Sequence, residues 1–513
     1  MKINFAEKFR KDLVAFREAT EKFYNKELSA NEYKGISGGF GSYAQRGGEL
    51  GMLRLRICGG RVTKDYLKFI VDSIDKYDID LLHLTTCQSI QLHNLNAAVI
   101  CSIIEEAWDN GFMTRGGGGD NPRNVMVTPL TGVEKGEPFD LTPYASIASD
   151  YLLSFIKEIN MPRKLKVCFS STPENWPHAT FRDLGFVANE NKKFDVYCAG
   201  GLGPNPKMGV CVAKDAEPSK ILYYIKAMIE TFCAYGNYEN RAQARTRYMQ
   251  NTLGADGLKK AFQEKLQEVL DAKEDLDITI DAHEITKTGP DLTFKHKRAV
   301  AQKQSGLYAV SYHPIGGNIT PAKWHEIYHT IMDMEDIELR ITPNESIYFI
   351  NCTAEEAKKI IAITEDGAQT VFETSVACIG ASICQHGLRD SQELLADCIK
   401  AVRPYHFADG VLPRIRISGC PSSCACHQVA AIGFRGAAKK TEEGMQPAFL
   451  MYEDGRQELL KEQFSADIGT ILAADIPKFF IELGQAVTEA NSVYDSWILT
   501  NHDKMIAIAQ KYC

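Results

Sequence analysis

Two pairs of cysteines mark the stretch from residue 378 to residue 424. The sequence reads Cys378-Ile379-Gly380-Ala381-Ser382-Ile383-Cys384 at one end and Gly419-Cys420-Pro421-Ser422-Ser423-Cys424 at the other. Five residues separate the cysteines of the first pair, and three separate those of the second. Four thiolates at one point are what a [4Fe–4S] cluster requires, so the pattern predicts a cluster site if the fold closes the long interval. Pro421 and its Gly and Ser neighbours favour a tight turn, in which backbone N–H groups can face the sulfurs.

Three other uses of these cysteines compete with a cluster. A single free cysteine is usually a small buried hydrophobe, but four in paired spacing are less readily explained by packing. Structural zinc normally uses pairs with about two to four intervening residues, which the interval from Cys378 to Cys384 exceeds. Disulfides are disfavoured because the fifteen cysteines are an odd number scattered along a long chain, a usage typical of a reducing compartment.

The composition narrows the class of protein. The chain has 513 residues, 44% of them hydrophobic and 24% charged, as in an ordinary globular protein of roughly two to four domains. Its formal net charge of −8 argues against a general nucleic-acid binder. The first residues lack a secretory pattern, and no apolar run approaches the roughly 20 residues that span a bilayer. We therefore expect a cytoplasmic protein without a nucleic-acid or membrane partner.

An internal repeat organises much of the remaining chain. In its first copy, Gly59-Gly60 precedes the helix N-cap Thr63, a helix with one apolar face, and a strand-like segment over residues 85–93. The same features recur at Gly316-Gly317, Thr320 and residues 342–350. Equivalent positions lie 257 residues apart. Each copy is too small to bury its apolar face alone, so we predict a duplication whose copies pair into one domain.

A weaker repeat links the segments that follow the two copies. Ser171–Trp176 parallels Gly419–Cys424 at an offset of 248 residues. Thr172 and Trp176 therefore stand where the second copy has Cys420 and Cys424. We interpret the first segment as a duplicate of the second that has no metal site.

The cysteine motif resembles the cluster signature of the sulfite and nitrite reductase haemoproteins. The resemblance rests on Cys378-x5-Cys384, Gly419-Cys420-Pro421-x-x-Cys424, His427 and Ala431-Ile432-Gly433-Phe434. It extends over most of the chain, from about residue 41 to about residue 436. It implies a [4Fe–4S] cluster held by Cys378, Cys384, Cys420 and Cys424. It also implies a sirohaem, a tetrapyrrole rich in carboxylates, with Cys424 as the axial ligand shared by the two cofactors.

The resemblance also implies the architecture. We expect an α+β, internally duplicated sulfite/nitrite reductase fold, with two ferredoxin-like half-domains paired and two α/β cofactor-binding domains. Residues 1–110 would form an N-terminal arm and the first half-domain, and residues 111–280 an α/β domain without cluster cysteines. Residues 300–365 would form the second half-domain, and residues 366–513 the domain that binds the cluster and the sirohaem.

Basic side chains occur in groups that suit an anion pocket. Arg54 and Arg56 alternate on one strand, Arg123 follows a glycine-rich run, and Lys164 and Lys166 alternate before an apolar segment. Any one of these residues taken alone is more often a solvated surface charge. With the cysteine motif, the resemblance implies that they bind the substrate oxyanion, with Arg54 and Arg56 both candidates for the first position.

One segment departs from the family pattern. Where family members have Thr-x-Arg-Gln, with the Arg on a sirohaem carboxylate, this chain has Thr85-Thr86-Cys87-Gln88. We expect either that Arg46 or Arg115 takes over that carboxylate, or that the haem sits slightly differently. Together with Cys424, the residues Arg46, Gln88 and Arg115 are the predicted cofactor-binding set.

The function implied is the six-electron reduction of sulfite to sulfide. Reduction of nitrite to ammonia at the same cofactors is the alternative, and Lys166 favours sulfite because the Lys-x-Lys pattern is that of sulfite reductases. A non-catalytic Fe–S electron carrier or a zinc-stabilised structural protein is a more remote alternative. The two glycine-rich runs of the chain, Gly116–Gly119 and Gly200–Pro204, do not match a dinucleotide-binding motif. We therefore expect an external electron donor, either ferredoxin or a flavoprotein subunit, and a small anionic substrate.

Overall fold

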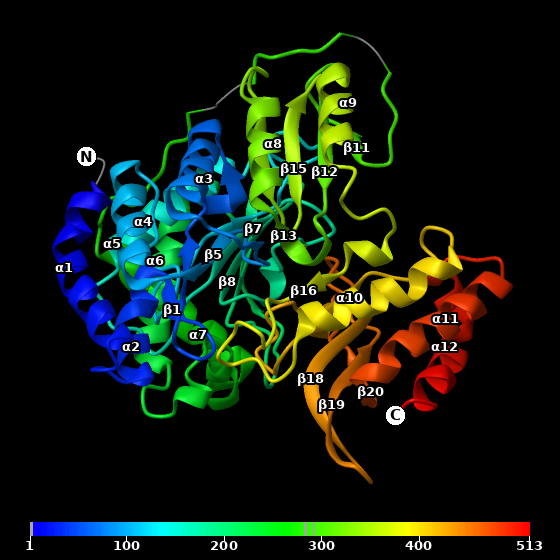
Figure 1. Cartoon of the computed structure of the whole chain (residues 1–513). Coiled ribbons are helices and arrows are strands. Elements are labelled where there is room, and N and C mark those ends of the chain that lie inside the picture. Colours follow the sequence, from blue (N-terminus) through cyan, green and yellow to red (C-terminus); the bar gives the residue numbers. More distant parts are fainter. Residues whose placement is uncertain (1–3, 282–284, 291–292) are drawn as a thin grey trace.

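The computed structural model describes residues 4–281, 285–290 and 293–513. In these ranges the chain forms four five-stranded sheets with helices packed around them (Figure 1). None of the helices described is both long enough and apolar enough to cross a membrane.

An N-terminal arm of two helices precedes the first sheet. Helix α1 (Phe5–Tyr24) starts at Asn4, whose side chain caps it, and α2 (Ala30–Ser37) starts at a capping box formed by Ser29 and Glu32. The apolar side chains of α1 recur at helical spacing and are buried against α4 (Ala97–Asp109). The arm therefore covers the outer side of the first half-domain.

The two half-domains each contain one antiparallel sheet. The first sheet has the order β1 (Ser42–Ala44), β2 (Gly51–Leu55), β5 (Ile90–Leu95), β4 (Leu82–Leu84) and β13 (Asn318–Ile319). The second has the order β11 (Ala299–Ala301), β12 (Tyr308–Tyr312), β15 (Ile347–Cys352), β14 (Glu338–Ile341) and β3 (Arg61–Val62). Each sheet ends on a short strand contributed by the other half. The halves are therefore joined by backbone hydrogen bonds, and the predicted pairing of two copies is confirmed.

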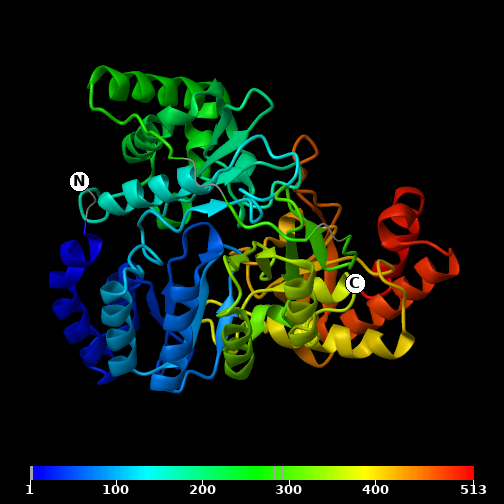
Figure 2. The same cartoon turned by 90° about the horizontal axis from the view of Figure 1, so that it is seen from above.

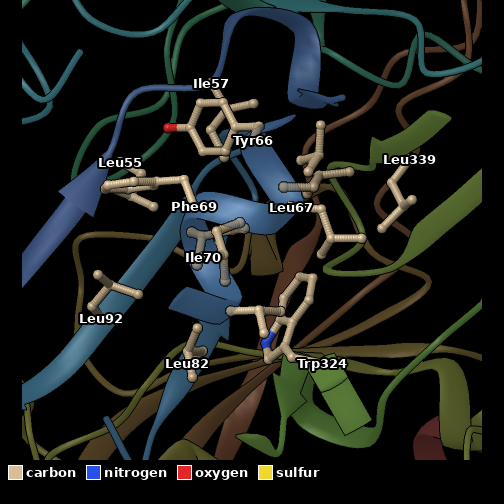
Figure 3. Close-up of a cluster of buried hydrophobic side chains, with 14 of the residues drawn as sticks. Leu55, Ile57, Tyr66, Leu67, Phe69, Ile70, Leu82, Leu92, Trp324 and Leu339 are labelled. Carbon is tan, nitrogen blue, oxygen red and sulfur yellow. The ribbon is translucent and has the colours of Figure 1, made fainter. Parts of the chain in front are cut away.

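One hydrophobic core spans both half-domains. Helix α3 (Lys64–Tyr77) begins at the predicted cap Thr63, and its partner is α8 (Pro321–Ile331), which begins at Thr320. Figure 3 shows Leu67 of α3 and Leu82 of β4 in one cluster with Trp324 of α8. The remaining helix of the second half, α9 (Ala354–Ile363), also packs on this core. Burial of both apolar faces in one core explains why neither copy stands alone.

The segments 85–93 and 342–350, predicted as single strands, are each a turn followed by a strand. The chain reverses between β4 and β5, and again between β14 and β15. Gln88 and Glu345 occupy the left-handed region at these turns, with φ of 55° and 57°. The alternating side chains concealed the reversal, because a left-handed glutamine or glutamate has no clear signature in sequence.

The two α/β units have the same strand order. One sheet runs β6 (Met126–Val127), β7 (Val167–Ser170), β8 (Leu184–Ala188), β9 (Phe194–Cys198) and β10 (Val210–Ala216). The other runs β16 (Val376–Ala377), β17 (Ile415–Ser418), β18 (Ile432–Thr441), β19 (Gly444–Glu453) and β20 (Ala466–Leu472). In both, the first three strands are parallel and the last two antiparallel. Val167 pairs with Leu184 as Ile415 pairs with Ile432, so the weaker repeat is also a structural one.

Each α/β sheet is covered by its own set of three helices, and the two units form separate lobes of the molecule. The first unit carries α5 (Thr142–Ser154), α6 (Ile221–Tyr235) and α7 (Met249–Asp271), and the second carries α10 (Ser391–Val402), α11 (Ile476–Glu489) and α12 (Tyr494–Gln510). Figure 2 shows the green lobe of α6 and α7 apart from the yellow-to-red lobe of the second unit, with the paired half-domains beside both. Residues from all three parts can therefore meet at the centre.

Candidate active site

A single cavity is lined by residues from both half-domains and both α/β units. The half-domains contribute the turn after β4, the end of β2 and the turn after β14. The α/β units contribute the segments before β7, between β7 and β8, and after β16 and β17. Its basic, acidic and sulfur-bearing residues are Arg54, His83, Cys87, Arg123, Lys164, Lys166, Arg182, Asp183, Arg245, Glu345, Cys378, Cys384, Cys420, Cys424 and Cys426.

The four predicted cluster ligands line this cavity together. Cys378 follows β16, and Cys420 follows β17, so the parallel pairing of these strands brings the two loops side by side. The Gly419 N–H donates to the sulfur of Cys378 at 3.2 Å, which realises the expected contact between a backbone donor and a thiolate. Thr86 donates its hydroxyl proton to the carbonyl of Cys424 at 2.7 Å and ties this loop to the first half-domain.

The electrostatics of the thiols suit a polynuclear centre. Cys424 is open to the cavity, but the surrounding protein atoms, followed by the nearby Cys378, Cys420 and Cys384, raise the pKa of its thiol far above the usual value. Four thiolates would repel one another at this point, and iron held by Cys378, Cys384, Cys420 and Cys424 would supply the compensating charge. In the described part of the chain, no three His, Cys, Asp or Glu side chains are grouped tightly enough to hold one metal ion. The donor set in this cavity, four cysteine sulfurs, is the one that a [4Fe–4S] cluster uses.

Two arginines meet at the glycine-rich loop. Arg54 donates to the Gly117 carbonyl at 2.7 Å, and Arg123 donates to the same oxygen at 3.0 Å and to the Gly119 carbonyl. Gly119 has φ of 67°, a conformation that favours glycine and turns the loop carbonyls toward the guanidinium groups. Burial and nearby Arg54 lower the pKa of Arg123 to about 10, so Arg123 stays cationic near neutral pH.

Lys164 and Lys166 lie just before β7. Together with Arg54 and Arg123 they form a group of cations in the cavity lining, called here the basic wall. Burial, and then Arg245, Arg123 and Lys166, lowers the pKa of Lys164 well below its usual value. The ammonium of Lys166 lies 3.2 Å from the sulfur of Cys87. The nearby carboxylate Asp183 is already occupied, because it bonds to Arg245 at 2.9 Å and accepts the Lys166 backbone N–H.

The wall therefore has an excess of positive charge. Unmatched buried cations are costly, so such a cavity favours an anionic ligand.

Arg182, Arg245 and Glu345 are cavity residues that the sequence reasoning missed. Arg245 belongs to a dense basic run with Arg241 and Arg247, which could have identified it. Arg182 and Glu345 carry no comparable sequence signal.

Two predicted arginines lie outside the set of described residues that line the cavity. Arg56 follows the last residue of β2, bridges to Met113 and donates to the Pro122 carbonyl at 2.9 Å. Arg115 pairs with Asp12 at 3.3 Å and stacks on Phe40. Both are held by contacts of their own, and of the alternatives Arg54 and Arg56 it is Arg54 that reaches the cavity.

The same holds for Arg46 and Gln88, neither of which is among the described lining residues. Arg46 donates to the carbonyls of Gly387 at 2.5 Å and Cys384 at 3.3 Å, so it braces the cluster loop from outside. Gln88 is completely buried and bonds to backbone groups. In the described structure Arg46, Gln88 and Arg115 therefore make supporting contacts with protein groups, and their contact with a cofactor stays a prediction.

Family models match most of these parts. A model described as "Nitrite and sulphite reductase 4Fe-4S domain" matches residues 118–270. A model described as "Nitrite/Sulfite reductase ferredoxin-like half domain" matches residues 43–107 and 300–366. Together these segments span more than half of the chain, and the second model matches both halves of the duplication.

Individual proteins of known name are similar over most of the chain. A chloroplastic ferredoxin–nitrite reductase from Zea mays is 25% identical over 416 residues, which are 77% of this chain and 70% of that protein. A sulfite reductase [NADPH] hemoprotein beta-component from Nitrobacter hamburgensis is 25% identical over 435 residues, with 75% and 73% covered. The solved structure of the Mycobacterium tuberculosis NirA protein superposes with a TM-score of 0.78 at 20% identity, covering 98% of each chain. This last likeness supports the fold.

Proposed function

The chain belongs to the nitrite and sulphite reductase family, and on that premise we propose that it reduces sulfite to sulfide in a six-electron reaction. It is an enzyme of this family, and its cofactors are the sirohaem and the [4Fe–4S] cluster that the family carries. Relatives are named for nitrite as well as for sulfite. Reduction of nitrite to ammonia is therefore the alternative.

The observation that carries the proposal is the shared cavity. The four predicted cluster cysteines line it together with cations from five separate segments, namely Arg54, Arg123, Lys164 with Lys166, Arg182 and Arg245. We assign Cys378, Cys384, Cys420 and Cys424 to the cluster, with Cys424 also facing the tetrapyrrole. When bound, these cofactors supply electrons to the substrate one at a time.

The remaining chemistry falls to the basic side chains. Arg54 and Arg123 are fixed by the glycine loop and offer a preorganised anchor for an oxyanion. Lys164 releases a proton more readily than an ordinary lysine, because burial and neighbouring cations disfavour its charged form. Each oxygen lost from the substrate leaves as water, so we assign Lys164 and Lys166 to proton delivery.

The electron donor is a separate protein in this proposal. Relatives are named as ferredoxin-dependent or as the haemoprotein component of an NADPH enzyme. Ferredoxin or a flavoprotein subunit is accordingly the partner to test.

Steady-state rates with sulfite and nitrite as competing substrates test the choice of substrate. With reduced ferredoxin or a chemical donor, we expect a higher kcat/KM for sulfite. Lys166→Asn should lower it at least about tenfold, since it removes a charged hydrogen bond of roughly 1.5–3 kcal/mol. Lys259→Asn on the exposed face of α7 is the control and should change neither rate. A strong preference for nitrite that Lys166→Asn leaves unchanged would favour the alternative.

A further inference from the structure

Cys87 is a thiol inside the basic cavity that the proposed reaction does not use. It lies in the turn between β4 and β5 and lines the cavity. Its sulfur accepts a hydrogen bond from the Lys166 ammonium at 3.2 Å. The side-chain amide of Asn124 donates to the Cys87 carbonyl at 3.0 Å, which holds the turn in place.

The surroundings of Cys87 stabilise its thiolate. Burial alone would raise the pKa of this thiol, but Lys166, Arg182 and Arg54 outweigh burial and lower it to about 6. The charge of the Cys87 thiolate also acts to raise the pKa of Arg123 and of the Glu345 carboxyl group, which are two further titratable groups of the cavity that interact with it. Cys168 on the neighbouring strand β7 shows the contrast, because burial raises its pKa to about 12.

Two buried polar oxygens of the same cavity lack a hydrogen-bond partner. The Asn124 side-chain oxygen and Oε2 of Glu345 have no hydrogen-bond partner among the described residues. These side chains line the same cavity, and the residues are 6% and 2% exposed. Buried polar atoms of this kind are normally satisfied, so they point to a bound molecule or water in the cavity that Cys87 lines.

We propose that Cys87 is a covalent modification site for small anionic electrophiles, which the cations of the cavity draw to its sulfur. With iodoacetate as the probe, the Cys87 sulfur attacks the carbon that bears iodine. The S–C bond forms with the sulfur electron pair, the C–I bond breaks, and iodide leaves. No oxidant is needed, and a thiolate has no proton to lose. Lys166 acts as the counter-ion of the thiolate, and the basic wall receives the carboxylate of the reagent.

The expected rate follows from two opposing effects. At pH 7 a thiol with a pKa of about 6 is mostly deprotonated. An ordinary thiol, with a pKa of 9.0, is then deprotonated in only about one molecule in a hundred. The lower basicity of the sulfur reduces its intrinsic nucleophilicity by roughly twentyfold. We therefore expect Cys87 to react about fourfold faster than an ordinary thiol at pH 7, before any attraction of the anion. Its rate should level off above pH 7, while that of an ordinary thiol rises about tenfold per pH unit up to its own pKa.

The test is alkylation of the holoprotein, with the modified cysteines identified by digestion and mass spectrometry. Iodoacetate and neutral iodoacetamide are compared between pH 6 and pH 9. Cys233, a partly exposed thiol on α6 whose pKa is raised by burial, serves as the internal reference. We expect Cys87 to react first among these two, to prefer iodoacetate, and to lose both the preference and the plateau in Lys166→Met. Lys259→Met is the matched control and should leave the alkylation of Cys87 unchanged.

Three results would overturn the proposal. Cys87 could stay unmodified in the holoprotein, it could react no faster than Cys233, or Lys166→Met could leave its rate unchanged. The readout is separate from reductase activity, so rapid alkylation of Cys87 in a chain that reduces neither sulfite nor nitrite would refute the proposed function alone. Protection of Cys87 by saturating sulfite would link the two.

Discussion

The turn over residues 85–89 and the turn over residues 342–346 are equivalent in backbone and different in chemistry. Both close with a hydrogen bond from the first threonine to the last serine, at 2.9 Å in the first half and 2.8 Å in the second. Both place their fourth residue in the left-handed region. That residue is Gln88 in one half and Glu345 in the other. The two copies of the turn thus have the same backbone geometry, but the side chain at the fourth position is an amide in one copy and a carboxylic acid in the other.

Gln88 satisfies its side-chain amide completely. Its nitrogen donates to the carbonyls of Gly59, Val127 and Ile341, and its oxygen accepts the Val127 N–H at 2.9 Å. This one buried side chain joins the first half-domain, the second half-domain and the first α/β unit.

Glu345 makes the counterpart of only one kind of contact that Gln88 makes, the hydrogen bond accepted from a backbone N–H. The backbone N–H of Ala377 bonds to its carboxyl group as Val127 bonds to Gln88. However, Gln392 donates to the carbonyls of Gly316 and Ala377, the counterparts of two carbonyls that Gln88 satisfies. Burial raises the pKa of Glu345 well above its usual range. Burial also lowers the pKa of nearby His83 to about 4, so the two side chains meet as neutral groups at 3.7 Å. The second half thereby places an uncharged acid in the cavity wall.

The comparison extends to the α/β units, where Thr172 stands in the place of Cys420. The largest effect we expect comes from Cys420→Thr, which gives the second copy the residue of the first. A cluster lacking one of four thiolates should be lost or severely depleted, and activity with it. Iron and acid-labile sulfide per chain measure this directly. Thr172→Ala, the matched change in the first copy, should leave both at wild-type values. Full iron content in Cys420→Thr would contradict the ligand assignment.

A smaller but still large effect is expected at Gln88. Gln88→Ala leaves three buried carbonyls and one buried N–H without their hydrogen-bond partner. Each lost hydrogen bond lowers the free energy of unfolding by about 1 kcal/mol or more. We expect the free energy of unfolding to fall by about 3–5 kcal/mol in urea denaturation. Gln510→Ala on the exposed face of α12 is the control. A loss below about 1 kcal/mol would show that water replaces the amide and that the turn does not need it.

The smallest effect concerns pH and Glu345. Because the folded state raises the pKa of this carboxyl, its stabilising contribution is complete below the unfolded value of about 4.3 and declines as pH rises through the folded value. Glu345→Gln removes this decline. The variant should therefore gain stability relative to the wild type by about 1 kcal/mol or more between pH 5 and pH 8. Thermal unfolding at both pH values measures the change, and a gain of equal size at both would mean that Glu345 is not held neutral.

The parts of the site that could be predicted share one property. The cysteines occur in short motifs whose spacing indicates a common metal site, and the resemblance carried by those motifs identified Arg54, Arg123 and the two lysines. All of them line the cavity. The duplication was visible for a similar reason, because glycines, caps and apolar faces repeat at a constant offset.

The remaining parts depend on tertiary structure. Gln88 and Arg115 are polar residues next to site residues in sequence, yet their side chains point to backbone carbonyls and to Asp12. Arg182 reaches the cavity through the loop between β7 and β8, which no local pattern reveals. The turns at Gln88 and Glu345 were interpreted as strands because their alternation is that of a strand, while the left-handed residue leaves no trace in composition.

The visible absorption spectrum of the purified protein is the most direct test of the assigned cavity. We predict bands of an isobacteriochlorin together with those of a [4Fe–4S] cluster, and the loss of the coupling between them in Cys424→Ser. A spectrum with a cluster alone, or with neither group in protein produced with an adequate supply of iron and sirohaem, would contradict the assignment.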